Sequence, residues 1–211
     1  MGKWGWIKYV AMAYTGYKIF QHYRKINYLN IAEKITPNDQ YIINLANEII
    51  SRHRGPYSIE QLLDIFDYMK NLQYIEDPNP YETLLPKDTL IMGKGDCDEF
   101  AVATASLIGA IGGTVRVVTL FNNKIGHAFC EVHMGEEGCI LENYLPFLSR
   151  YDNYPIGWEI DNQNHEWLSF DTLLPVPGCI HTDFAIIGEN KWNWKPSTKV
   201  RYFPWSPHYN A

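Results

Sequence analysis

Hydrophobic residues recur at helical spacing in the first half of the chain and alternate with polar residues in much of the second half. Apolar positions three or four apart within 36–52, 58–72 and 96–111 predict three helices. From residue 114 the period falls to two, which predicts strands at 114–121, 126–134 and 166–172. Helices followed by an antiparallel sheet predict an α+β fold.

The first two of these helices have recognisable start signals. Thr36 followed by Pro37 predicts a cap and a first helical residue, and Ser58 with Gln61 forms a capping-box pattern. Residues 139–141 are apolar enough to predict a further short strand. Residues 143–165 carry prolines, glycines and aromatic residues without a clear period, which predicts an inserted loop.

The third helix begins with a cysteine. Asp96 is a suitable N-cap, Glu99 completes a capping box, and Cys97 then occupies the first helical position. Free backbone N–H groups and the helix dipole favour a thiolate at that position. A lone cysteine is more often a buried, inert residue. Whether Cys97 acts as a nucleophile therefore depends on whether the rest of the chain contains a base and a group to orient it.

The pattern divides the chain into three parts. Residues 1–32 predict a basic, aromatic amphipathic helix, 33–174 a single compact domain with the insertion at about 143–165, and 175–211 a Pro- and aromatic-rich segment wrapping that domain in extended form. The first helix suits either packing on its own domain or docking at a partner or membrane surface.

Charge is segregated along the chain. All 24 acidic residues lie within 33–189, whereas residues 1–32 contain five Lys/Arg and 190–211 contain four. An acidic body argues against a nucleic-acid partner, because phosphate contacts need Lys and Arg. The basic ends favour contact with a protein assembly or membrane surface, or with the acidic body itself.

The cysteine pattern bears on the compartment. The four cysteines, at 97, 130, 139 and 179, show no framework spacing, and a free Cys97 leaves an odd number. This argues against a disulfide scaffold and mildly favours a reducing compartment such as the cytoplasm. No apolar run approaches the roughly 20 residues of a transmembrane helix.

Three residues supply the parts of a thiol-dependent acyl transfer. Such chemistry needs a nucleophile, a base, and a group that orients the base. Cys97 supplies the first, His127 at the head of a strand the second, and Asp171 on a neighbouring strand the third. Alone, a histidine opening a strand is more often structural.

The same residues carry a family resemblance. Gly95–Ala101 (GDCDEFA), Gly126–Val132 (GHAFCEV) and Trp167–Asp171 (WLSFD) resemble the three motif blocks of the transglutaminase-like, papain-like thiol superfamily. The resemblance covers about residues 58–174 and implies a papain/transglutaminase-like core, with a cysteine-bearing helix packed on an antiparallel sheet. It also implies a Cys97–His127–Asp171 triad.

Several roles stay open at this point. The long gap between His127 and Asp171 leaves Glu142 and Asn143 as alternative third members, since they lie at the separation more usual for the family. Gln73 or Tyr74 is the candidate to complete an oxyanion hole with the Cys97 backbone N–H. Asp98 is interpreted as solvated, or as selecting a cationic substrate.

A metal site is the competing interpretation of the thiols and imidazoles. The candidate ligands are Cys130, His133, Cys139, Cys179 and His181. No CxxC pair is present, and residues 130 and 133 fall on opposite faces of one strand. We therefore expect no metal and no cofactor.

The sequence as a whole predicts a cysteine hydrolase that cleaves a peptide or protein amide through a thioester. Two alternatives share the fold: a transglutaminase, in which an amine replaces water, and a non-catalytic interaction protein. The sequence contains no calcium-site motif of the kind associated with animal crosslinking enzymes, which leans toward hydrolysis.

Overall fold

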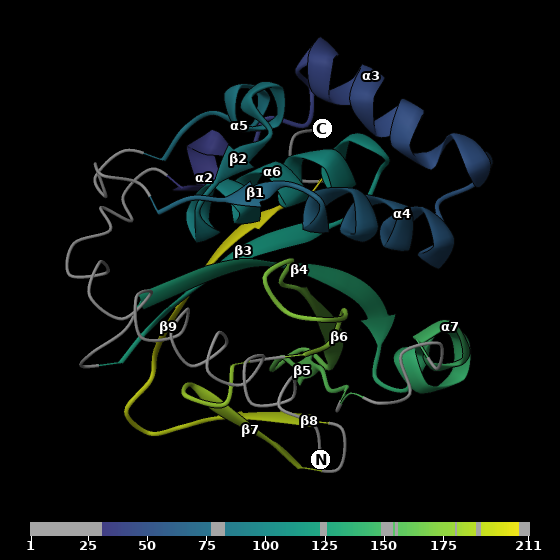
Figure 1. Cartoon of the computed structure of the whole chain (residues 1–211). Helices are drawn as coiled ribbons and strands as arrows, with labels where there is room; N and C mark the ends of the chain where they lie inside the picture. Colours follow the sequence, from purple (N-terminus) through teal and green to yellow (C-terminus); the bar gives the residue numbers. More distant parts are fainter. Residues whose placement is uncertain are drawn as a thin grey trace, which may run out of the picture.

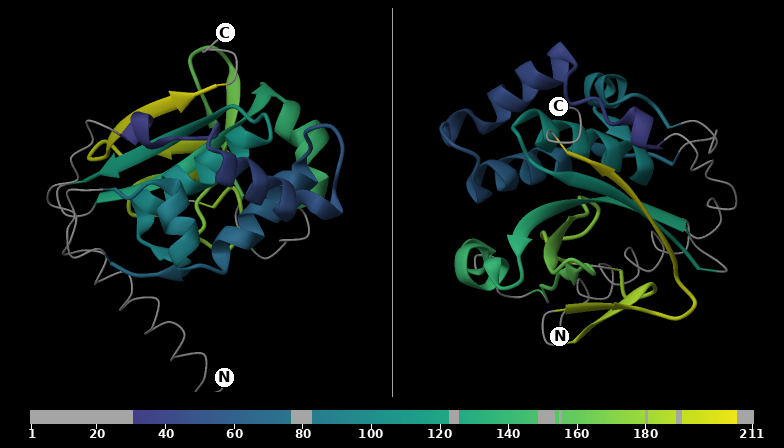
Figure 2. Two further views of the ribbon diagram at one scale, coloured as in Figure 1. Left: turned by 90° about the horizontal axis from the view of Figure 1, so that it is seen from above. Right: turned by 180° about the vertical axis from the view of Figure 1, so that it is seen from behind.

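The computed structural model describes residues 31–76, 83–122, 126–148, 154, 156–179, 181–188 and 191–206. Helices cover one face of an antiparallel sheet, and a two-stranded ribbon lies against the other (Figure 1; Figure 2). The α+β fold is confirmed. Residues 1–30 of the helix predicted within 1–32 lie outside the described residues. Among the described helices, none is long and apolar enough to cross a membrane.

The helices of this layer precede the main sheet in the sequence. Its elements are α2 (Ile31–Lys34), α3 (Gln40–Ile49) continued by the 3₁₀ turn η2 (Ile50–Arg52), α4 (Ile59–Lys70), α5 (Pro86–Met92) and α6 (Cys97–Ala110). Two short parallel strands, β1 (Gln73–Tyr74) and β2 (Lys94–Gly95), run side by side just before α6. They tie the chain after α4 to the chain that enters the cysteine helix.

The main sheet has the strand order β5-β6-β4-β3-β9, with every neighbouring pair antiparallel. Its strands are β3 (Val115–Phe121), β4 (Gly126–Glu136), β5 (Glu159–Ile160), β6 (His165–Phe170) and β9 (Lys199–Trp205). A separate ribbon pairs β7 (Ala185–Gly188) with β8 (Lys191–Trp194). The predicted strands at 114–121, 126–134 and 166–172 are therefore confirmed, with shifted ends.

Helix α6 is the buried centre of the helical layer. The predicted capping box is present: the Asp96 side chain accepts from the Glu99 backbone, and Asp96 N donates to Glu99 Oε2 (2.9 Å). Asp98 N also donates to the Asp96 carboxylate (3.2 Å). The helix is buried from Cys97 to Gly109. Small residues on several faces allow α3, α4, α5 and the sheet to pack around it.

Strand β4 has the two faces that its alternation predicted. Ala128, Cys130 and Val132 belong to the large core that includes the helices. On the other face, Phe129 packs with Val118, Leu120 and Phe184 in a second apolar cluster. Because successive side chains of a strand alternate in direction, His127 shares the face of Phe129.

Two local predictions were wrong. The first long helix is capped by Asp39, whose carboxylate accepts from Tyr41 N at 2.8 Å, and not by Thr36. Pro37 lies in the preceding turn, and Thr36 N donates instead to Ser106 Oγ at 3.0 Å. Asp39 lies directly before the first helical turn, where a carboxylate can reach the free N–H groups.

The second wrong prediction is the short strand at 139–141. These residues begin a helical segment, the π-helix η3 (Ile140–Tyr144), which continues into α7 (Leu145–Leu148). Buried Glu166 on β6 accepts from Gly138 N (2.9 Å), Ile140 N (2.6 Å) and Trp158 Nε1 (2.9 Å). A carboxylate distant in sequence thus satisfies the donors at this helix start.

The C-terminal segment, predicted to wrap the domain in extended form, contributes a strand to the main sheet. Residues 199–205 form β9, which pairs with β3 over its whole length, from Val115–Trp205 to Phe121–Lys199. Pro204 is accommodated because β9 is an edge strand. The sheet that carries the candidate site therefore draws one of its five strands from this segment.

Candidate active site

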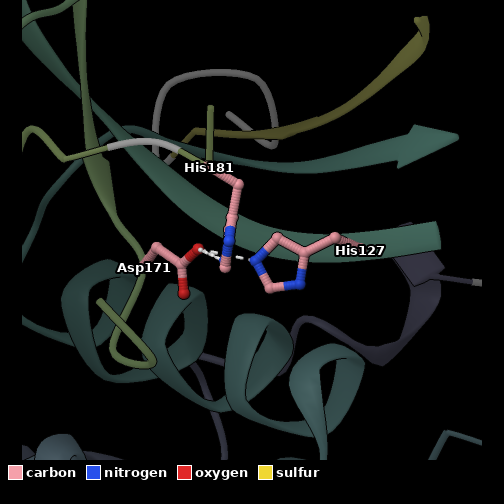
Figure 3. Close-up of side chains that lie close together, drawn as sticks. All are labelled: His127, Asp171 and His181. Carbon is pink, nitrogen blue, oxygen red and sulfur yellow. Dashed lines mark hydrogen bonds and ion pairs between the residues drawn. The ribbon is translucent and has the colours of Figure 1, made fainter. Parts of the chain in front are cut away.

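His127 and Asp171 lie in direct contact within the sheet. Nε2 of His127 is 2.6 Å from Oδ2 of Asp171, and the two residues are only 2% and 4% exposed. His127 is the second residue of β4, and Asp171 immediately follows the neighbouring strand β6. Figure 3 shows Nε2 directed at the carboxylate, while the other ring nitrogen points away from it.

Both partners are held in place by the backbone around them. Cys130 pairs with Phe170 in the β4–β6 register, so the end of β6 comes opposite the beginning of β4. The second oxygen of Asp171, Oδ1, accepts from Leu173 N at 3.1 Å. The carboxylate is thereby fixed by one backbone bond and left with Oδ2 facing the imidazole.

A third side chain, His181, completes the cluster. Its Nε2 lies 3.5 Å from Asp171 Oδ2, and its ring meets the ring of His127 edge-on with centroids 4.5 Å apart (Figure 3). The ligand atoms of His127, Asp171 and His181 all lie within 4.8 Å of one another. Two imidazoles therefore share one carboxylate oxygen.

Burial and charge set the protonation states of this cluster. Burial lowers the pKa of His127 below its ordinary value, and Asp171 offsets this only in part. Burial alone would raise the pKa of Asp171, but the charge and hydrogen bond of His127, helped by His181, hold that pKa far below its usual range. At neutral pH the site contains an ionised carboxylate beside a neutral His127.

Cys97 belongs to the helical layer. It is the first residue of α6 and is 1% exposed, and none of the four cysteines forms a disulfide. Helix α6 packs directly on β4, and Cys97 belongs to the same core cluster as Ala128, on the face of β4 opposite to that of Phe129. The structure thus brings His127 and Asp171 into contact and seats Cys97 at the start of the helix that packs over their sheet.

Acidic side chains surround the start of α6. Asp96 and Glu99 are buried, and so is Asp98, at 8% exposed, where it accepts a hydrogen bond from Thr83 Oγ1. Burial and the nearby carboxyl of Asp98 raise the pKa of Asp96 far above its ordinary value. The interpretation of Asp98 as solvated was therefore wrong: its carboxylate fixes the segment that precedes α5.

The two oxyanion candidates differ in their surroundings. Tyr74 pairs with Gly95 across β1 and β2, two residues before Cys97, and its ring meets Phe100 edge-on at 6.2 Å. Gln73 pairs with Lys94 and is exposed. Tyr74 is thus nearer in register to the backbone N–H of Cys97.

Glu142 and Asn143 lie apart from the His127–Asp171 pair. Both are exposed on η3, and the Asn143 amide donates to Cys139 O at 3.2 Å. The carboxylate beside the imidazole is that of Asp171.

The zinc-type side chains that the sequence suggested do not converge as a set in the described part of the chain. Cys130 is buried in the main core, His133 stacks edge-on against His165 and Trp167, and Cys139 lies at η3. His181 alone among them joins a close group of ligand atoms, with His127 and Asp171.

The neighbourhood of His181 was not foreseen from the sequence. After Asp171 the chain turns back on itself, with Gly178 N donating to Ser169 O (2.9 Å) and Ser169 Oγ to Cys179 O (2.6 Å). The Pro177-Gly178 dipeptide is a turn signal, and Gly178 has φ +82°. A chain reversal at that turn is the signal that would have placed residue 181 beside residue 171.

Glu131, the acid of the second motif block, has a structural partner. Its Oε2 accepts from Arg116 Nε at 2.6 Å, and Arg116 also donates to Glu159 Oε2 at 2.9 Å. The guanidinium lies between the rings of Trp167 and Tyr202, 4.1 Å from each centroid. This arrangement joins five residues from five strands on the face that bears His127.

Comparison with known proteins gives a family match and one similar solved structure. The model of the Transglutaminase-like superfamily matches residues 43–172. A crystal structure described as a putative cysteine protease from Cytophaga hutchinsonii is similar, with 15% identity and a TM-score of 0.46. That match covers 82% of this chain and 50% of the other, so the chain spans about half the length of that structure. No curated protein matches the chain.

Proposed function

Because the chain belongs to the transglutaminase-like superfamily, we propose that it is a thiol-dependent amide hydrolase acting through Cys97, His127 and Asp171. Cys97 is the nucleophile, His127 the general base, and Asp171 the group that orients the imidazole. The observation that carries this proposal is the buried 2.6 Å contact between His127 Nε2 and Asp171 Oδ2.

That contact determines which ring nitrogen is left for chemistry. With Nε2 donating to Asp171, the neutral ring carries its lone pair on Nδ1. Nδ1 can then accept the proton of the Cys97 thiol. The lowered pKa of His127 supports this role, because the imidazole is neutral and able to act as a base at neutral pH.

Acylation follows from these roles. As His127 Nδ1 takes the thiol proton, the sulfur attacks the amide carbonyl and a tetrahedral oxyanion forms. The Cys97 N–H at the helix start, together with Tyr74, is proposed to stabilise that oxyanion. His127 then gives its proton to the leaving nitrogen, the C–N bond breaks, and a thioester remains on Cys97.

Deacylation decides the reaction class. A water molecule that loses a proton to His127 would release the acid, whereas an amine in the same position would form a new amide. The same three residues serve both outcomes, so a transglutaminase is the second candidate, and hydrolysis is the proposal that the first experiment tests.

The test starts from the thiol, because the natural substrate is not needed for it. We expect iodoacetamide, a small electrophile suited to a thiol that is 1% exposed, to label Cys97 faster than Cys130 and Cys179. Replacing His127 with Ala should slow the Cys97 reaction about 100-fold at neutral pH. Mass mapping of the labelled peptides measures each rate, and His165→Ala serves as the imidazole control.

A peptide library then separates the candidates. Release of new amino termini that stops in Cys97→Ala supports hydrolysis, and incorporation of an added primary amine supports transfer. If Cys97 reacts no faster than the buried cysteines and Cys97→Ala leaves cleavage unchanged, the chain is instead a non-catalytic member of the superfamily.

A further inference from the structure

The cluster of His127, Asp171 and His181 has one feature that the hydrolase mechanism does not use. The mechanism needs a single imidazole on Asp171, yet a second one is directed at the same carboxylate oxygen (Figure 3). Nε2 of His181 is buried, and its 3.5 Å contact with Asp171 Oδ2 does not meet hydrogen-bond geometry. A buried polar atom without a hydrogen bond is costly, so its position calls for an explanation.

The three donors match the ligand set of a divalent transition metal. Two imidazole nitrogens and one carboxylate oxygen, with water in the fourth position, form a common Zn²⁺ set. Ligands about 2 Å from Zn²⁺ in a tetrahedron lie roughly 3.3 Å from one another. The Asp171 oxygen lies 2.6 Å from one imidazole nitrogen and 3.5 Å from the other, which brackets that spacing.

The surroundings also suit a metal ion. Phe129 lies against the ring of His127, and Phe184 lies edge-on to that of His181. An apolar wall around ligands strengthens their electrostatic attraction for a cation.

We propose that His127, Asp171 and His181 form an inhibitory site for a divalent transition-metal ion of the Zn²⁺ type. Binding requires the lone pair on His127 Nε2, so the proton held there moves to Nδ1 and the Asp171 hydrogen bond is replaced by a metal bond. With Nδ1 protonated, His127 can no longer accept the thiol proton. The inhibition, though not the binding, rests on the proposed function.

Direct binding is measured on the purified, metal-free chain with Co²⁺ as a spectroscopic probe and Zn²⁺ as its competitor. We expect one Co²⁺ per chain, with visible bands of nitrogen and oxygen ligands and no thiolate-to-cobalt charge-transfer band. His181→Ala should weaken binding about 100-fold or more, since it removes a ligand. His165→Ala is the matched control, because the side chains of His165 and His181 are similarly exposed, at 31% and 29%.

A second variant guards against misfolding. In His181→Gln, circular dichroism establishes the fold, and thermal unfolding is followed with and without Zn²⁺. Zn²⁺ should raise the unfolding midpoint of the wild type and of His165→Ala by mass action, and leave that of His181→Gln unchanged.

The outcomes separate this proposal from the previous one. Cys97→Ala should retain the cobalt spectrum, and Zn²⁺ should slow iodoacetamide labelling of Cys97 in the wild type but not in His181→Ala. If labelling is indifferent to Zn²⁺ while cobalt binding still needs His181, the metal site stands and its inhibitory role fails. The site itself is overturned by a lack of binding, by binding that survives His181→Ala, or by a charge-transfer band that disappears in Cys97→Ala.

Discussion

Nε2 of His127 lies 2.6 Å from Oδ2 of Asp171, although the two residues are 44 positions apart in the chain. The long segment between them forms η3, α7 and β5, yet β6 still pairs directly with β4. The insertion therefore lengthens the connection without separating the two strands. A large gap in sequence is compatible with contact whenever both ends of an insertion return to neighbouring strands.

The first prediction concerns Asp171. Asp171→Asn keeps the size of the side chain but removes the charge that favours an imidazolium and the preference for an Nε2–H tautomer. We expect turnover of a peptide selected from the library to fall about 1,000-fold, with little change in KM. Glu142→Gln, on exposed η3, is the control and should keep wild-type turnover. Equal losses in both variants would contradict the role given to Asp171.

The second prediction is a pH profile. Burial lowers the pKa of His127 below its ordinary value of 6.5, so the base stays neutral further into the acid range than a free histidine. Because folding lowers this pKa, the stabilisation from the neutral imidazole is present above pH 6.5 and is lost as pH falls through the folded value. The acid limb of the Cys97 labelling rate should therefore have its midpoint below pH 6.5. A midpoint above 6.5 would exclude a desolvated base.

The third prediction concerns Asp96. The folded chain raises the pKa of this acid, through burial and the nearby Asp98 carboxyl, far above the ordinary 3.8. The folded state then binds more protons than the unfolded one, so stability decreases as pH rises from 3.8. Asp96→Asn keeps an N-cap acceptor and removes the need to protonate this carboxyl on folding, so we expect the free energy of unfolding to rise by about 1 kcal/mol at neutral pH.

Urea unfolding at several pH values checks this expectation. The increase in the free energy of unfolding caused by Asp96→Asn should be larger at about pH 8 than at about pH 4. Only the wild type must protonate Asp96 on folding, and that cost grows with pH. Asp39→Asn, at the cap of α3, is the matched control and should show little pH-dependent gain, since Asp39 is only half-buried. A gain independent of pH would assign the effect to something other than charge.

The fourth prediction concerns Arg116. Removing its guanidinium leaves Glu131 buried without a cation, and breaking one partner of a buried ion pair costs about 3–5 kcal/mol. Arg116→Met should therefore lower the free energy of unfolding by that amount, measured by chemical denaturation. The double variant Arg116→Met with Glu131→Gln should recover part of the loss, because no uncompensated charge remains. No recovery would mean that ring packing, not charge, dominates.

The fifth prediction tests the contact between α6 and the C-terminal segment. A Cβ added at Gly109 would lie 2.8 Å from a ring atom of Trp205 and 2.9 Å from Pro37 Cβ. Gly109→Ala should destabilise the protein by about 1–3 kcal/mol despite its better helix propensity. Adding Trp205→Leu should cost less in the Gly109→Ala background than in the wild type, because the crowded ring is then already strained.

Much of the fold could be predicted from the sequence because local signals agreed with each other. The Asp96–Glu99 capping box, the small residues of α6 and the alternation of β4 each depend on neighbours close in the chain. Such features follow from propensity and period alone. The errors at Thr36 and 139–141 have a different origin. There the deciding groups were Ser106 and Glu166, which reach these segments only in the folded molecule.

The candidate site divides in the same way. Cys97, His127 and Asp171 could be proposed because each stands in a motif block, and the contact of the last two agrees with that proposal. His181 stands in no such block and comes from a turn whose course depends on contacts with Ser169. Its approach to Asp171 depends on tertiary contacts, and the only local sign of it was the turn signal at Pro177-Gly178.

The pairing of β9 with β3 has a consequence for biosynthesis. Strand β3 leaves the ribosome well before its outer neighbour, so its unpaired N–H and C=O groups stay open to other chains until residues 199–205 follow. Trp205, packed close to Gly109 of the cysteine helix, also arrives late. The nascent chain therefore completes the sheet beneath its candidate nucleophile only after β9 has been made, and interruption upstream of β9 would release an aggregation-prone edge.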